Sequence, residues 1–117
     1  MTSSKINFSP KGLLIGGKWV DSYKGGRFST INPSNGQHLG EVPLAEKEDV
    51  NRAVIAAKQA FQDWGKMPLK ERAGFLIKLA DKLLENRDEL GMMDCVDSGN
   101  ALNGMKGDVD WSSDSLK

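Results

Sequence analysis

The pattern of hydrophobic and polar positions changes once along this chain, from short extended runs to a helical period. Up to about residue 43, apolar residues form short runs separated by glycine, asparagine and proline, which is typical of strands joined by turns. Beyond it they recur at intervals of three and four, the spacing of one helix face. The pattern predicts an α/β fold in which N-terminal β-hairpins precede three to four amphipathic helices.

Two turns predict the two hairpins. Gly16-Gly17 separates two short apolar runs, and a Gly-Gly pair supplies the positive φ angles of a two-residue hairpin turn. The second turn is Asn32-Pro33-Ser34-Asn35-Gly36, in which proline sets one dihedral angle and Asn35-Gly36 tolerates the left-handed region. Its strands are predicted at Arg27–Ile31 and His38–Val42, and Pro43 ends the extended section.

Glycine and proline residues divide the helical part. The first helix is predicted at Glu46–Asp63, with acidic residues in its first turn, where the helix dipole favours them. Gly65 ends it, and Pro68 suits the first position of a second helix. The predicted apolar faces are Val50, Ala53, Val54, Ala57, Ala60, Phe61 and Trp64 in the first helix and Phe75, Leu76, Leu79, Ala80, Leu83 and Leu84 in the second.

The last third of the chain predicts two weaker helices. The pattern resets around Asn86-Arg87-Asp88, after which a short third helix runs to Gly99. A fourth is predicted from Ala101, weakened by Gly104 and Gly107 at about 1 kcal/mol each relative to alanine. No cap precedes Lys117, which is how a sequence reads when it is cut inside an element. Residues 1–12 are polar and aperiodic and are predicted to form a flexible arm before an ordered region at residues 13–117.

The composition of the chain limits the classes of partner that it is expected to bind. Sixteen basic residues balance sixteen acidic ones, so there is no cationic footprint for nucleic acid or for an anionic membrane. The one cysteine, Cys95, excludes an internal disulfide, and no signal-peptide or membrane-spanning segment is evident, so a cytoplasmic location is expected. A domain of this length is expected to bury roughly two thirds of its unfolded surface around a modest core.

Five segments in this order resemble the opening of the NAD(P)-dependent aldehyde dehydrogenase superfamily. They are Leu14-Ile15-Gly16-Gly17-Lys18-Trp19-Val20, Ile31-Asn32-Pro33-Ser34-Asn35-Gly36, Glu48-Asp49-Val50-Asn51-Arg52-Ala53-Val54, Glu71-Arg72-Ala73 and Leu79-Ala80-Asp81. Asp97-Ser98-Gly99 is similar to the family's Asp-x-Gly-Lys-Pro segment, although Asn100 and Ala101 replace its Lys-Pro pair. The resemblance implies the N-terminal portion of a dinucleotide-binding domain, an incomplete part of a Rossmann-like fold.

The resemblance also implies what the chain lacks. Family enzymes are about four times this length and oxidise an aldehyde to a carboxylic acid with NAD or NADP, through a cysteine thiolate and a glutamate-activated water. In the family pattern these groups, the oxyanion-stabilising asparagine and the pyrophosphate-binding turn all lie beyond Lys117. We therefore expect no catalytic and no cofactor-binding residue in this chain, and no activity from it alone.

The remaining candidate residues favour structural interpretations. Cys95 lies in the third helical pattern, far ahead of the family's catalytic position, and His38 has no nearby ligand or catalytic partner. Asp108, Asp110 and Asp114 have the spacing that begins a calcium loop, but the required glycine and glutamate are missing, which favours a solvated acidic helix face. By family resemblance, Ile31 and Asp110 match positions near a structural monovalent cation, so they are the metal candidates. Trp19, Trp64 and Trp111 lack interleaved basic residues and are expected to pack in a core or an interface.

Two functions stay open. The first is an N-terminal fragment of an aldehyde dehydrogenase, from a shortened gene, a split reading frame or an engineered chain, inactive by itself. The second is a stand-alone small α/β module for binding or interaction, without enzymatic activity. In both, apolar helix faces left uncovered favour association, either with the remainder of an aldehyde dehydrogenase or with further copies of the chain.

Overall fold

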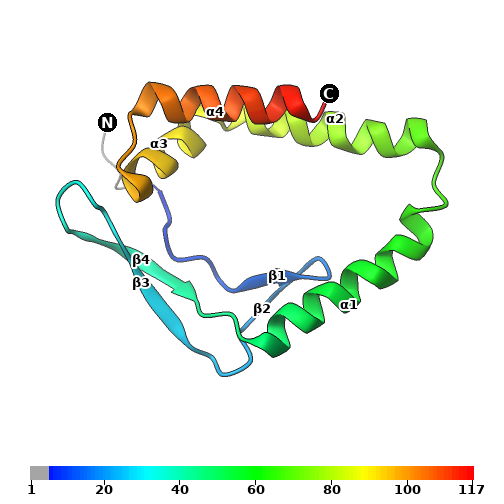
Figure 1. Cartoon of the computed structure of the whole chain (residues 1–117), viewed down its shortest axis with the longest axis horizontal. Helices are drawn as coiled ribbons and strands as arrows, with labels where there is room; N and C mark the ends of the chain where they lie inside the picture. The colour runs from blue at the N-terminus through cyan, green and yellow to red at the C-terminus, as the bar shows by residue number, and fades with distance from the viewer. Residues whose placement is uncertain (1–5) are drawn as a thin grey trace. The chain divides into compact units, whose positions relative to one another are not determined.

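The computed structural model describes residues 6–117 and confirms the predicted α/β order of two hairpins followed by four helices (Figure 1). The chain divides into two compact units, one containing Ile31–Gln37 and Met67–Lys117 and the other Asn7–Thr30 and His38–Lys66. The elements are β1 Leu13–Ile15, β2 Lys18–Val20, β3 Arg27–Ile31, β4 His38–Pro43, α1 Lys47–Trp64, α2 Leu69–Glu85, α3 Arg87–Ser98 and α4 Leu102–Ser115.

The strands form two separate two-stranded sheets, β1-β2 and β3-β4. In the first, Leu14 faces Trp19 across an antiparallel ladder, and Gly16 and Gly17 adopt φ angles of 61° and 77°. The Gly-Gly turn is therefore confirmed, because both central residues occupy the region that a type I′ turn requires. The predicted arm at residues 1–12 lies partly outside the described residues. In its described part, Ser9 Oγ accepts a 3.0 Å hydrogen bond from the main-chain nitrogen of Glu41.

The second hairpin turns where it was predicted. Within the turn, the main-chain nitrogen of Asn32 donates to the oxygen of Gln37 and that of Gly36 donates to the oxygen of Asn32, both at 2.8 Å. Of the Asn35-Gly36 pair only Gly36 takes a positive φ, 73°. Strand β4 continues one residue beyond the expected Val42, to Pro43.

The helix boundaries lie within one residue of the predicted ones. Glu46 is the N-cap of α1, which ends at Trp64, and Gly99 ends α3 in the left-handed conformation with φ 78°. Three predicted starts were one position early, since α1 begins at Lys47, α2 at Leu69 and α4 at Leu102. Pro68 precedes α2 instead of opening it, because its ψ of 140° is extended, and the extended ψ of 135° at Ala101 delays α4 to Leu102.

The hydrophobic core is smaller than the modest one expected from the chain length. Among the described residues the buried hydrophobic side chains are Ala80 on α2 and Val109 on α4, within the unit in which α4 packs against α2 and α3 (Figure 1). Most of the predicted apolar face of α2 stays exposed, with Leu79 49% exposed, as does that of α1, with Phe61 66% exposed. These faces have apolar spacing but no layer of structure over them, since both sheets of the described chain are two-stranded hairpins.

Candidate functional site

The predicted metal ligand Asp110 lies on α4 and is paired with Arg87, the first residue of α3. Arg87 Nε donates to Asp110 Oδ1 at 2.6 Å and Arg87 Nη2 donates to Asp110 Oδ2 at 2.9 Å. This two-bond geometry is the strong form of an arginine-carboxylate contact. It lowers the pKa of Asp110 below its ordinary value, and the same hydrogen bond raises the pKa of Arg87. The carboxylate therefore stays ionised and joins α3 to α4.

The second predicted ligand, Ile31, is the last residue of β3 and leads into the Asn-Pro turn. Its side chain is half exposed and carries no ligand atom, so only its main-chain oxygen could serve a cation. Within residues 6–117, no three His, Cys, Asp or Glu side chains are gathered as a metal site would require. The Ile31 and Asp110 site stays a prediction, and a cation there would compete with Arg87 for the carboxylate.

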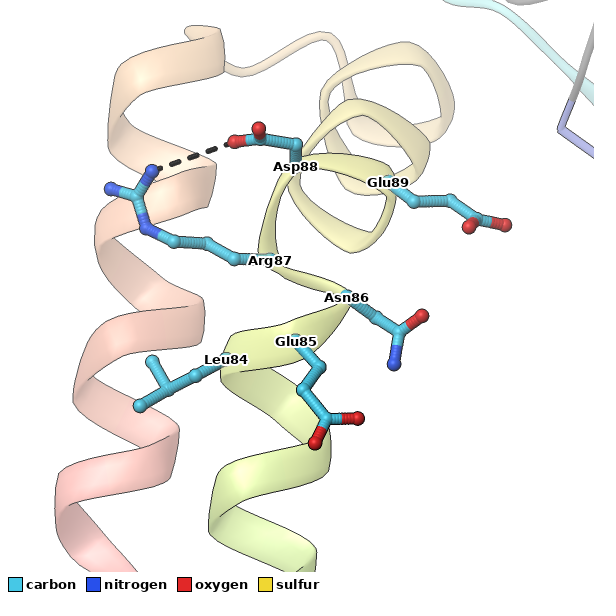
Figure 2. Close-up of a pocket in the computed structure, with 6 residues that line it drawn as sticks. All are labelled: Leu84, Glu85, Asn86, Arg87, Asp88 and Glu89. Atoms are coloured by element: carbon cyan, nitrogen blue, oxygen red, sulfur yellow. Dashed lines mark ion pairs between the residues drawn. The ribbon is translucent and has the colours of Figure 1, made fainter.

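A surface pocket of about 420 Å³ surrounds the junction of α2 and α3 (Figure 2). Its lining is mostly polar, and within it Arg87 Nη1 lies 3.6 Å from Asp88 Oδ1. Lys106, on α4, places its Nζ 3.0 Å from the same Asp88 oxygen. Two of its charged residues, Arg87 and Asp88, thus join α3 to α4. The lining residues are Leu84, Glu85, Asn86, Arg87, Asp88 and Glu89.

The other unit contains a buried carboxylate that organises its surroundings. Asp49 is 1% exposed, and it accepts hydrogen bonds from the main-chain nitrogens of Glu46 at 2.8 Å and Tyr23 at 3.0 Å. Arg52 also donates to it and reaches the main-chain oxygen of Asp21 at 3.2 Å. The bond from Glu46, followed by those from Tyr23 and Arg52, lowers the pKa of Asp49 against the opposing effect of burial. Asp49 therefore ties the start of α1 to the loop after β2.

No catalytic arrangement forms around the two residues that invite one. Cys95 is a free, partly buried thiol on α3. His38 Nε2 lies 3.0 Å from Glu41 Oε1, which also accepts a 2.7 Å bond from Ser29 Oγ. The Glu41 carboxylate therefore lies between the Ser29 hydroxyl and the His38 imidazole on the exposed surface of a hairpin. A catalytic nucleophile, by contrast, must contact its base directly.

The described residues do not fit a dinucleotide. A pyrophosphate is held by a glycine-rich turn between a parallel strand and a helix N-terminus. In residues 6–117 both sheets are two-stranded hairpins, and the paired glycines Gly16 and Gly17 close one of them.

None of the helices in this part of the chain has the length and apolar character needed to cross a bilayer.

Sequence reasoning missed Asp49 and Arg87 as organising residues. Asp49 carried a local signal, because it lies three residues after Glu46 in the spacing of a capping box. Arg87 carried none, since its partner Asp110 is 23 positions away and only tertiary packing brings them together.

Comparison with known proteins assigns the arrangement to a family. Residues 19–117 match the model of the aldehyde dehydrogenase family. The chain is 40% identical over 96 residues to malonate-semialdehyde dehydrogenase of Halalkalibacterium halodurans, covering 82% of this chain and 20% of that protein. It is 40% identical over 92 residues to cytosolic 10-formyltetrahydrofolate dehydrogenase of Mus musculus, covering 77% and 10%.

A solved structure agrees with these matches. The crystal structure of an NAD-dependent aldehyde dehydrogenase from Sinorhizobium meliloti superposes with a TM-score of 0.88 at 29% identity, covering 96% of this chain and 23% of that one. The chain therefore belongs to the aldehyde dehydrogenase family, as an N-terminal segment of it. It spans between a tenth and a quarter of the length of these three proteins.

Proposed function

We propose that this chain is scaffold of an aldehyde dehydrogenase whose chemical groups lie outside the 117 residues. The whole enzyme would oxidise an aldehyde to a carboxylic acid, with NAD or NADP accepting hydride when bound. The observation that carries this proposal is the contrast between ordered helices and their exposed apolar faces, of which Phe61 and Leu79 are examples. Those faces have the spacing of core helices but lack a covering layer.

The role proposed for the chain itself is positional. The Arg87 pair with Asp110 fixes α3 against α4, and Asp49 fixes α1 to the loop after β2. Neither cluster contains a nucleophile beside a base, so the chain alone is expected to be inactive. A cytoplasmic location and the absence of nucleic-acid or membrane partners remain part of the proposal, supported by the balanced charge.

Fragment complementation tests this role. The chain would be mixed with a malonate-semialdehyde dehydrogenase from which the matching 96-residue segment has been deleted, and NADH formation would be followed with an aldehyde substrate. We expect no activity from either part and measurable activity from the mixture. A control mixture would use the chain with Leu79→Glu, which places a charge on the exposed apolar face of α2 and should reduce the recovered activity. NADH formation by the chain alone would refute the proposal.

Self-association is the alternative partner, and the same exposed faces favour it. Without the remainder of an aldehyde dehydrogenase, two copies could cover these faces for each other, as the stand-alone module hypothesis requires. Complementation separates the two, because a stand-alone module would keep its oligomeric state and restore no activity when the deleted enzyme is added.

We also infer that the intact enzyme, and not this chain alone, holds a monovalent cation at Ile31 and Asp110. Asp110 is engaged by Arg87 at both oxygens, and two ligand residues do not complete a coordination shell. Sodium titration followed by thermal melting provides the test, with Asp110→Asn as the comparison. We expect equal sodium responses in the two isolated chains. A response confined to the unsubstituted chain would show that the isolated segment already binds the cation.

A further inference from the structure

We propose that Asn35, in the turn between β3 and β4, is a site of spontaneous deamidation. The asparagine there would convert to aspartate and isoaspartate. Asn35 and its neighbours Gly36 and Gln37 are exposed. The residue after Asn35 is glycine, so the main-chain nitrogen that must attack has no side chain beside it. Apart from Gly36 itself and its two chain neighbours, no described residue has an atom within 4 Å of where a Cβ on Gly36 would project.

Hydrogen bonding prepares the electrophile. The main-chain nitrogen of Gln37 donates to Asn35 Oδ1 at 2.9 Å, which polarises the side-chain carbonyl and fixes its direction toward the following backbone. One bond opposes the reaction, because the Gly36 nitrogen that must attack donates to the oxygen of Asn32 at 2.8 Å. That bond lies in a surface turn, where local opening costs little compared with a core element.

The chemistry balances without any cofactor. The deprotonated main-chain nitrogen of Gly36 attacks Cγ of Asn35, a new N–C bond closes a five-membered succinimide, and the Cγ–Nδ2 bond breaks with release of ammonia. Water then opens the ring at either carbonyl, giving aspartate or isoaspartate. No atom is oxidised or reduced. The isoaspartate product places an additional methylene in the main chain.

The turn also contacts a helix end, so the change is not silent. A Cβ on Gly99, which ends α3, would lie 3.0 Å from Pro33 Cγ and 3.8 Å from Ser34 Oγ. Both residues precede Asn35 in the same turn. A lengthened and newly charged turn would therefore strain the contact between the Asn-Pro segment and the C-terminal end of α3.

The chain contains its own comparison. Asn103-Gly104 has the same dipeptide but lies in the first turn of α4. Closing the succinimide there requires Asn103 to leave helical dihedral angles, so the reaction must wait for local opening of the helix. At mildly alkaline pH, we expect Asn35 to deamidate at least roughly tenfold faster than Asn103 in the folded chain.

Peptide mass spectrometry with separation of the aspartate and isoaspartate products measures both rates. A parallel incubation in denaturant should bring the two rates together, because the dipeptides are then equivalent. The control Asn35→Gln should remove the product at position 35 and leave the rate at Asn103 unchanged. The proposal would be overturned if the ratio of the Asn35 rate to the Asn103 rate were no larger in the folded chain than in denaturant. Conversion of Asn35 to aspartate without isoaspartate would also overturn it, because that outcome excludes the succinimide.

Discussion

The hydroxyl of Ser113 on α4 donates a 3.0 Å hydrogen bond to the main-chain oxygen of Ala80 on α2, and both residues are fully buried. The carbonyl of Ala80 lies within α2, so its oxygen can accept one hydrogen bond from the helix main chain and a second from the Ser113 hydroxyl. Small side chains at these two positions let the helices approach closely. Few apolar side chains are buried in residues 6–117, and this polar contact joins two of the helices at buried positions.

Replacing Ser113 with alanine should lower the free energy of unfolding by about 0.5–1.5 kcal/mol, the usual net value of one hydrogen bond. The loss stays moderate because the Ala80 carbonyl keeps its place in the α2 ladder. Chemical denaturation measures it, and the exposed neighbour provides a matched control, since Ser112→Ala should change stability by less than about 0.5 kcal/mol. Equal effects at the two positions would show that the buried bond has no special weight.

The substitution Asp49→Asn should flatten the acid side of the pH dependence of stability. The hydrogen bonds from Glu46, Tyr23 and Arg52 hold the pKa of Asp49 below its ordinary value of 3.8. A lowered carboxyl pKa stabilises the folded chain at pH values above the unfolded pKa, and this stabilisation is lost as the pH falls through the folded one. Melting temperature against pH measures the effect. Asp49→Asn should melt lower near neutral pH and lose less on acidification.

The control for that experiment is the exposed neighbour on the same helix turn. Glu48→Gln removes one negative charge from the first turn of α1 but breaks no buried hydrogen bond, so its acid limb should parallel that of the unsubstituted chain. If Glu48→Gln flattens the profile as much as Asp49→Asn, general charge effects and not the buried carboxylate control the acid response.

Gly91 should tolerate no side chain, although alanine is the better helix former. It is buried on α3, and a Cβ there would lie 3.1 Å from the main-chain nitrogen and 3.2 Å from Cα of Lys106 on α4. Gly91→Ala should therefore destabilise the chain by about 1–3 kcal/mol through overpacking. Gly107→Ala, on α4 in open space, should instead stabilise it by up to about 1 kcal/mol. Denaturation midpoints compare them, and stabilisation by both would contradict the close approach of α3 and α4.

The sequence was most informative where local chemistry decides the structure. The Gly16-Gly17 turn and the glycine that ends α3 follow from backbone preferences alone, and the structure contains both. It was less informative about burial. The 3.6-residue period correctly identified which faces of α1 and α2 are apolar, but periodicity says nothing about what covers a face, and Phe61 and Leu79 remain exposed.

The resemblance named Asp110 only as a candidate cation ligand, and nothing in the sequence pointed to its pair with Arg87. Periodicity and spacing gave no reason to connect residues 87 and 110, because an ion pair between two helices depends on how the helices pack. Asp49 was within reach of local reasoning as the N3 residue of a capping box that begins at Glu46. Its bond to Tyr23, 26 positions earlier, required the fold.

The exposed face of α2 should drive association of the isolated chain, and one charged substitution should weaken it. Burying a leucine contributes about 1.5–3 kcal/mol, so Leu79→Glu should raise the dissociation constant of the dimer by roughly tenfold or more. Glutamate is a good helix former, so α2 itself should persist. Gln59→Glu on the exposed surface of α1 adds the same charge without removing apolar area and should leave association unchanged. Sedimentation velocity over a range of concentrations measures all three chains, and an unsubstituted chain that stays monomeric throughout would refute association through this face.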